Sequence, residues 1–329
     1  MLGLARQTKV TTGASGPVLV GLAGAAIFLL VGCLVSDIFA QQTVAGLAQG
    51  AIFGGLALAL VLIYRATEVI NFAQGEMAMA TTYVCYQLLQ WGVSYWLAFF
   101  LTLVFGFVFG VFTYGAIIRP VQHRSVIAIV IVTLGLFILI DGVVAWIWGA
   151  DIKFMASPFG NKVFRSGGVA VSAQDIGVFA VSIISMVALW ALFQFTKVGL
   201  AMRAAALRPG AASLVGVRVD RMLAIGWGLA AMLGAVAGLM AEPTQFALQP
   251  TLMQPILLLA FAAAVLGGLE SPIGAVIGGL LIGVFLNLVG QYVGFATSEL
   301  RLPIAFAVLL LVLLIRPTGL FGRKQVRRV

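Results

Sequence analysis

Long apolar runs, separated by short polar segments, make up most of this chain. Ten runs approach the ~20 residues that a helix needs to cross the hydrocarbon core of a membrane. They fall at 17–35, 44–64, 77–91, 96–118, 126–148, 176–195, 222–241, 255–268, 273–290 and 302–315. The runs are continuous and rich in Ala, Leu and Gly, whereas barrel strands alternate polar and apolar positions. The pattern therefore predicts an all-α, polytopic transmembrane helical bundle of ten spans.

Composition supports a membrane protein. Hydrophobic residues make up 62% of the 329 positions and charged residues only 9%, whereas a soluble domain has roughly a quarter charged residues. In lipid, backbone polar groups must be satisfied within the protein, which leaves helices for such continuous runs. Two runs, 77–91 and 255–268, are short for a full span. They indicate broken or tilted helices, unless their ends have been placed wrongly.

Basic residues orient the predicted spans. With the N-terminus in the cytoplasm, fifteen of the 19 Lys and Arg residues fall on the inner side, as the positive-inside rule requires. The outer side receives Lys153, Lys162, Arg165 and Arg301. One span more or fewer in the middle would remove this bias, so we expect both termini to be cytoplasmic.

The net charge of +9 does not indicate nucleic-acid binding, because the basic residues are spread over short loops beside apolar runs. Such positions suit contacts with anionic lipid headgroups. The basic start and the apolar run of the first 40 residues also resemble a signal peptide, but the run is long for one, and we favour a retained helix. No metal-ligand cluster, cofactor motif or nucleophile–base pair is apparent, so the sequence predicts neither an enzyme nor a metal site.

Polar residues interrupt the apolar pattern at 65–76 (RATEVINFAQGE). Polar side chains and a glycine between two helices suit a re-entrant break that faces a cavity or the mouth of a pathway. A plain cytoplasmic turn with a capping glutamate fits the chemistry equally well.

The longest polar segment on the inner side is 196–221. A helical run at 199–207, a break at Arg208, Pro209 and Gly210, and a second run at 211–217 are predicted, because Pro and Gly end one helix and start another. This basic segment could dock a partner protein or could contact only lipid headgroups.

A single permease domain, 1–329, would then carry an extra first helix at 1–43, the inner segment at 196–221, and an outer loop at 149–175 that is either a docking surface or a connector.

Glycine-rich positions at 266–279 (LGGLESPIGAVIGG) predict close helix packing rather than chemistry, since small residues let helix backbones approach. Spans two to five and seven to ten run in opposite directions, and each set has an interrupted segment near its start, NFAQ at 71–74 and QFALQ at 245–249. This weak similarity is consistent with an inverted repeat, a common way to place a pathway at the midplane.

Six short motifs, in order from residue 44 onward, resemble the inner-membrane permeases of branched-chain amino-acid ABC importers. They are 69–76 (VINFAQGE), 119–121 (RPV), 199–204 (GLAMRA), 214–217 (LVGV) with 220–221 (DR), 264–268 (AVLGG) and 316–320 (RPTGL). The resemblance implies a pore-forming subunit in a bacterial inner membrane, with no catalytic residues and no cofactor. No G-x-x-x-x-G-K-[ST] motif is present, so ATP hydrolysis would belong to other subunits.

The same resemblance implies partners and site residues. The partners would be a second, homologous permease, with a heterodimer favoured over a homodimer, two cytoplasmic ATPases, and a periplasmic or lipid-anchored solute-binding protein. The wall or gate of the translocation pathway would include Glu68, Asn71, Phe72, Gln74, Gly75 and Glu76. A coupling helix against an ATPase would include Arg203, Ala204, Ala205, Arg208, Ala212, Leu214, Gly216 and Val217.

One departure from the family pattern leaves the solute open, because Gln74 stands where the family often has histidine. In a second departure, Leu207 and Arg208 stand where acidic residues are common, which indicates a dedicated ATPase of complementary charge. Branched-chain amino acids are favoured, with urea, amides and small organic acids as alternatives. A different class, an ion-coupled secondary carrier that works alone, would need ionisable groups within the spans. Asp141 is the best candidate for such a group.

Overall fold

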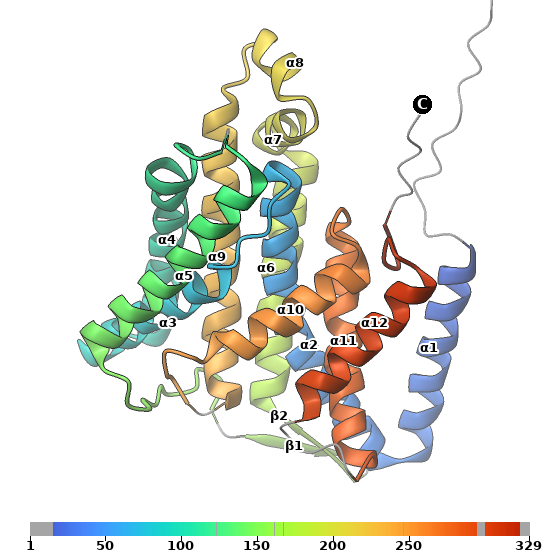
Figure 1. The fold of residues 1–329 in the computed structure, drawn as a ribbon. Helices are drawn as coiled ribbons and strands as arrows, with labels where there is room; N and C mark the ends of the chain where they lie inside the picture. Colours follow the sequence, from blue (N-terminus) through green and yellow to red (C-terminus); the bar gives the residue numbers. More distant parts are fainter. Residues whose placement is uncertain are drawn as a thin grey trace, which may run out of the picture.

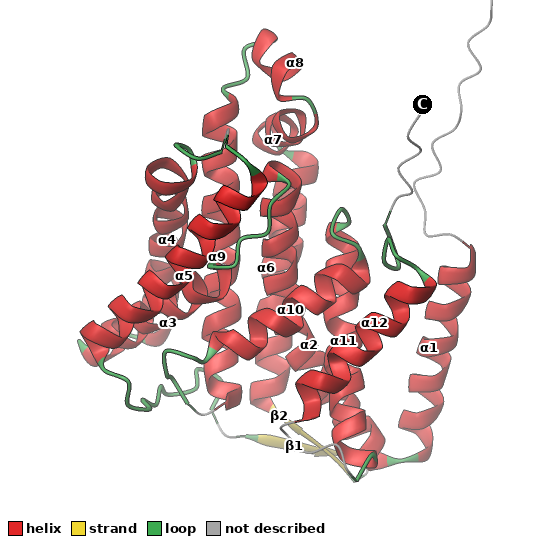
Figure 2. Ribbon diagram, viewed as in Figure 1, coloured by secondary structure: helices red, strands yellow, loops and turns green. Residues whose placement is uncertain are grey.

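The computed structural model describes residues 16–122, 124–160, 162–166, 168–245, 247–294 and 300–322. Most of this chain is helical (Figures 1 and 2). The elements, in order, are α1 (Gly16–Val35), α2 (Asp37–Thr67), α3 (Gln74–Gln90), α4 (Tyr95–Thr113), the π-helical turn η1 (Tyr114–Ile118), α5 (Val126–Trp148), β1 (Val163–Ser166), β2 (Val169–Ser172), α6 (Ala173–Phe195), α7 (Lys197–Leu207), α8 (Pro209–Leu214), α9 (Val219–Gln245), α10 (Met253–Gly267), α11 (Pro272–Tyr292) and α12 (Arg301–Ile315).

Each of the ten predicted runs coincides with a helix, if η1 is taken as the end of α4. Six of these helices in the described ranges are long and apolar enough to cross a membrane, namely α2, α4 with η1, α5, α6, α9 and α11. The predicted short runs correspond to α3, with 17 residues, and α10, with 15 residues. The helical membrane fold is therefore confirmed, while the count of ten spans stays a prediction.

Helix α2 lies at the centre of the bundle. It has 31 residues, most of them buried, and it packs against α6, α9, α10 and α11. Its start is capped by Ser36, whose hydroxyl oxygen accepts a hydrogen bond from the Phe39 N–H at 3.3 Å. It ends at Glu68, whose φ of 56° places the backbone in the left-handed region and turns the chain away from the helix axis.

Glycines bring α2 and α11 into backbone contact. Gly46, Gly50 and Gly54 of α2 face α11, and a Cβ atom built on Gly50 would lie 2.8 Å from the Gly279 carbonyl oxygen. A Cβ atom on Gly46 would lie 2.6 Å from the Val284 Cα atom. Since real Cβ atoms do not approach so closely, only glycine fits these positions. The packing role predicted for the glycine-rich segment is confirmed by this contact and by the one between α10 and α11, where Gly267 meets Gly274.

The bundle has two distinct ends. Helices α7 and α8, the start of α1 and the end of α12 face the same side in Figure 1, and β1 and β2 lie at the opposite end. The hairpin pairs Val163 with Ser172 and Ser166 with Val169 in antiparallel register. It occupies part of the predicted outer loop at 149–175, where the sequence indicated only turns. The same loop is joined to the connector between α9 and α10 by a pair of hydrogen bonds between Lys153 and Leu248, at 2.9 and 2.8 Å.

Candidate functional site

The segment between α2 and α3 folds into the interior of the protein. Glu68 is exposed at the end of α2, but Val69 and Asn71 are buried, and Phe72 is half-buried. Helix α3 then begins at Gln74, and its first turn, including Gly75 and Glu76, is buried. A solvated turn would leave these residues exposed, so their burial favours the re-entrant break over the plain turn.

Two buried amides hold this break in place. The Asn71 side-chain oxygen accepts a hydrogen bond from the Ala73 N–H at 3.1 Å, and its amide donates to the Gln74 side-chain oxygen at 3.2 Å. The Gln74 amide in turn donates to the Ala230 carbonyl oxygen of α9 at 3.0 Å. These bonds satisfy polar groups that would otherwise be costly to bury, and they fix the first turn of α3 against α9.

The first turns of the two short helices meet. A Cβ atom built on Gly75 would lie 3.0 Å from the Leu257 Cβ atom and 3.4 Å from the Met253 carbonyl oxygen, both in α10. Gly75 is therefore the point of close approach between α3 and α10. The two interrupted segments noted in the sequence lead into these two helices, and they arrive at one place in the fold.

Glu76 is fully buried at this meeting point, with 0% of its surface exposed. Neither carboxyl oxygen has a hydrogen-bond partner among the described residues. The Asp141 carboxyl group of α5 and the Gln254 side-chain amide of α10 interact electrostatically with the Glu76 carboxyl group. Gln254 makes no hydrogen bond of normal geometry to it. We call Asn71, Gln74, Glu76, Asp141 and Gln254 the polar junction.

Sequence reasoning missed part of this junction. Gln254 was not predicted as a site residue, and Asp141 was considered only as the ionisable group of a carrier. Tyr83 was also missed. Its buried hydroxyl group has no hydrogen-bond partner in the described chain and interacts electrostatically with Asp141. Its ring lies 5.3 Å from the Trp148 ring, whose N–H donates to the Gln87 side-chain oxygen at 2.9 Å. A polar residue in the first turn of a short span was the available signal for Gln254.

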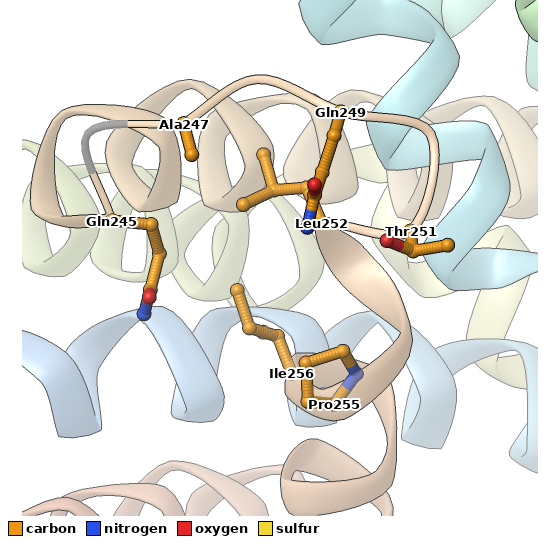
Figure 3. Close-up of a pocket in the computed structure, with 7 residues that line it drawn as sticks. All are labelled: Gln245, Ala247, Gln249, Thr251, Leu252, Pro255 and Ile256. Atoms are coloured by element: carbon orange, nitrogen blue, oxygen red, sulfur yellow. The ribbon is translucent and has the colours of Figure 1, made fainter. Parts of the chain in front are cut away.

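A small cavity of about 120 Å³ opens near the start of α10 (Figure 3). It is lined by Gln245, Ala247, Gln249, Thr251, Leu252, Pro255 and Ile256. Close to it, at the end of α9, the buried Glu242 side chain accepts a hydrogen bond from the Met155 N–H at 3.0 Å. The outer loop, the end of α9 and the start of α10 are thus joined around a polar opening at the hairpin end of the bundle.

At the other end, α7 and α8 reproduce the predicted pair of short helices with a break at Arg208. The predicted coupling residues divide into three groups. Ala205 and Ala212 are buried, at 3% and 4% exposure, so they pack within the chain. Arg208, Leu214 and Gly216 are exposed, with Leu214 at 88%. The remaining three are half-buried, namely Arg203, Ala204 and Val217.

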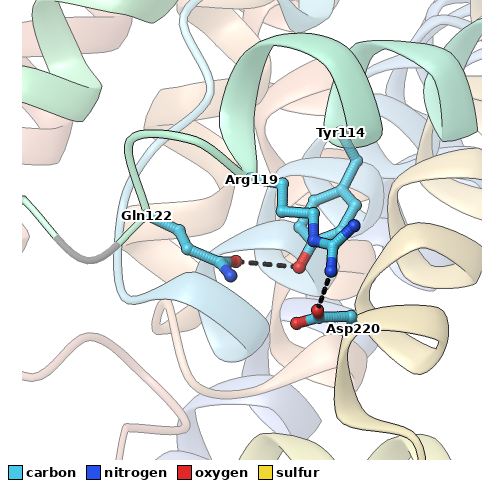
Figure 4. Close-up of polar contacts among 4 residues, drawn as sticks. All are labelled: Tyr114, Arg119, Gln122 and Asp220. Carbon is cyan, nitrogen blue, oxygen red and sulfur yellow. Dashed lines mark hydrogen bonds and ion pairs between the residues drawn. The ribbon is translucent and has the colours of Figure 1, made fainter.

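An ion pair joins two other sequence motifs at this end. The Arg119 guanidinium group lies 2.7 Å from the Asp220 carboxylate at the start of α9 (Figure 4). Beside it, the Tyr114 hydroxyl group and the Gln122 side-chain oxygen are 2.8 Å apart, in hydrogen-bond contact. The turn between α4 and α5 is thereby connected to the helix that follows α8.

A bundle whose described part contains six helices long and apolar enough to cross a membrane defines a helical membrane protein. The model of the family "Branched-chain amino acid transport system / permease component" matches residues 42–314. The chain belongs to this family. It is accordingly an inner-membrane permease component rather than an enzyme.

Curated relatives agree with this assignment. The high-affinity branched-chain amino acid transport system permease protein LivH of Salmonella typhimurium is 30% identical over 304 residues, covering 88% of this chain and 98% of the relative. The corresponding permease protein BraD of Pseudomonas aeruginosa is 30% identical over 306 residues, with the same coverage. The probable LivH protein of Methanocaldococcus jannaschii is 31% identical and covers 81% of this chain and 87% of that protein.

Proposed function

We propose that this chain forms the translocation pathway of an ATP-driven importer for branched-chain amino acids or a related small solute. Its partners would be two cytoplasmic ATPases, a second homologous permease and an external solute-binding protein. The observation that carries the proposal is the buried polar junction in a chain of this permease family. Polar and ionisable groups within membrane spans are costly, and they mark solute or ion pathways.

The break before α3 supports a pathway role for Glu68, Asn71, Phe72, Gln74, Gly75 and Glu76. Short helices whose N-terminal turns meet inside a bundle are typical of transporters built from inverted repeats. Here α3 follows the long helix α2, and α10 follows the long helix α9. We therefore assign spans two to five and seven to ten to two inverted repeats, with the pathway between them.

The α7–α8 segment supports ATPase coupling. It carries the exposed apolar side chains Leu207, Leu214 and Val215, with 74%, 88% and 79% of their surface exposed, beside the exposed Arg208. Exposed apolar side chains in a polar segment are typical of a protein interface. This end of the bundle also carries the basic loops of the inner side, which supports the proposal that it faces the cytoplasm, as we expect of both termini.

Co-purification tests this proposal. A tagged copy is extracted from its native membrane in mild detergent, and the bound proteins are identified by mass spectrometry. We expect an ATPase and a second permease in the wild type, and loss of the ATPase in Leu214→Asp. Val163→Asp is the matched control, because Val163 is exposed by 51% on β1 at the opposite end.

Two outcomes would contradict the proposal. If Leu214→Asp retains the ATPase, α8 is not the coupling element. If the wild-type chain is recovered alone and transports solute when reconstituted alone, the ion-coupled carrier becomes the better interpretation, with Asp141 and Glu76 as its ionisable pair.

A further inference from the structure

Glu76 has the wrong surroundings for a carboxyl group that serves only packing. Its side chain is completely buried, and both of its oxygens lack a hydrogen-bond partner within the described ranges. A buried polar group without a partner destabilises a protein, and a buried charge does so more strongly. Natural structures satisfy nearly all such groups, so a carboxyl group whose two oxygens make no hydrogen bond of normal geometry, even with Gln254 near it, points to a missing partner.

Among the described residues, the side chains that interact with this carboxyl group include no cation. The charged neighbour that acts on Glu76 is Asp141, which has the same sign, and the other polar neighbour is the neutral Gln254. Helices α3, α5 and α10 contain no Lys, Arg or His. The basic residue of α9, Arg221, is exposed in the first turn of that helix. Two acidic groups, the buried Glu76 and the half-buried Asp141, therefore interact within the bundle, and none of these four helices places a basic side chain beside them.

An aromatic hydroxyl group extends the same electronegative lining. Tyr83 lies seven residues after Glu76 on α3, so the two side chains share a face of the helix. The Tyr83 hydroxyl is buried without a hydrogen-bond partner and is influenced by Asp141. Its ring contacts the Trp148 ring. Carboxylates, a phenol oxygen and aromatic faces together attract a compact cation such as an ammonium group.

We infer that the polar junction binds the ammonium group of the transported solute. Glu76 forms the ion pair with the ammonium group, and Asp141 and the Tyr83 hydroxyl oxygen accept its remaining hydrogen bonds. This inference rests on the proposed function, and it narrows the solute to a compound with a primary ammonium group, such as a neutral α-amino acid. Urea, simple amides and organic acids lack that group at neutral pH.

Carbodiimide labelling tests this inference directly. The purified wild-type complex with its partner subunits is treated with dicyclohexylcarbodiimide, which modifies carboxyl groups in apolar surroundings, and labelled peptides are quantified by mass spectrometry. We expect Glu76 to be labelled by the reagent. L-leucine or methylammonium is expected to lower the labelling at least about five-fold, because a carboxyl group that is paired with a bound ammonium group is protected from the reagent. The analogue 4-methylpentanoate, which has the leucine side chain but no ammonium group, is expected to leave the labelling unchanged. Equal labelling in all four conditions would overturn the inference, as would protection by 4-methylpentanoate.

Uptake into proteoliposomes gives a second, independent measurement. We expect Glu76→Gln to lower L-leucine uptake at least about ten-fold, because an ammonium group would be left in the interior without its counter-ion. Glu76→Asp is expected to retain more uptake than Glu76→Gln. The matched control is Glu242→Gln, which replaces another buried carboxyl group by an amide whose oxygen can still accept the Met155 N–H, and its uptake is expected to stay within about two-fold of the wild type.

Different results would contradict the importer function and the ammonium site. Absence of an ATPase from the purified wild-type complex contradicts the proposed function. Normal ATPase content together with wild-type uptake by Glu76→Gln contradicts the ammonium site alone and leaves Glu76 as a protonated packing residue.

Discussion

Arg119 and Asp220 form an ion pair, with 2.7 Å between guanidinium nitrogen and carboxylate oxygen, across about a hundred residues of sequence. Arg119 directly follows η1, and Asp220 lies in the first turn of α9, just after the α7–α8 segment. The pair therefore connects the turn between α4 and α5 to the proposed coupling end. Both side chains are about half exposed, at 58% and 47%.

Breaking this pair should affect stability only slightly. A double-mutant cycle of Arg119→Ala and Asp220→Ala is expected to give a coupling free energy of about 0.2–1 kcal/mol, because exposed ion pairs are screened by water and salt. Thermal unfolding of the purified protein at low and high salt measures this value. A coupling energy above about 2 kcal/mol would show that the pair is more strongly desolvated in the membrane than its exposure indicates.

The glycine contact between α2 and α11 should tolerate no side chain. Gly50→Ala is expected to lower the free energy of unfolding by about 1–3 kcal/mol, because its Cβ atom would lie 2.8 Å from the Gly279 carbonyl oxygen. Gly55→Ala, five residues along the same helix, is the control, since nothing lies within 4 Å of its Cβ position. Thermal unfolding compares the two variants, and an equal effect would refute the steric explanation.

The Asn71 side chain should keep the segment between α2 and α3 folded. Asn71→Ala removes the hydrogen bonds to Ala73 and Gln74 and is expected to cost about 1–3 kcal/mol of stability, since buried polar groups are left without partners. Limited proteolysis between α2 and α3, followed by mass spectrometry, is expected to become faster. Gln90→Ala, at an exposed position, serves as the control. Unchanged proteolysis in Asn71→Ala would indicate that α9 and α10 alone hold the segment.

Two neighbouring substitutions in α8 should separate folding from docking. Ala212→Asp is expected to destabilise the protein by about 1–3 kcal/mol or more, because it places a carboxylate at a position with 4% exposure. Leu214→Asp is expected to change stability by less than about 0.5 kcal/mol, since that side chain is 88% exposed. Thermal unfolding of the isolated chain tests both. If Leu214→Asp unfolds the protein, its loss of an ATPase could not be assigned to docking.

Sequence periodicity predicted the helices well, because each apolar run is long and is ended by polar or glycine-containing segments. The break at Arg208 followed from Pro209 and Gly210. The burial of Ala205 and Ala212 could not be predicted, since an alanine-rich helix has no clear polar face in its sequence. The hairpin of β1 and β2 was missed because two strands of four residues are outweighed by the surrounding turn residues.

The composition of the polar junction was only half predictable. Asn71, Gln74 and Glu76 lie within one motif, so local sequence indicated them together. Asp141 and Gln254 come from other helices, and no periodicity reports which faces of distant helices meet. Only packing in three dimensions brings these side chains to Glu76.

The contact between α2 and α11 has a mechanical consequence. Where glycine backbones touch, there are no side chains whose rotamers could adjust to a new position, and sliding one helix along the other would bring backbone atoms into collision. The two helices are therefore expected to move as one rigid unit in the middle of the protein. Any rearrangement that admits a solute from one side of the membrane and releases it on the other is then expected in the helices that flank this pair.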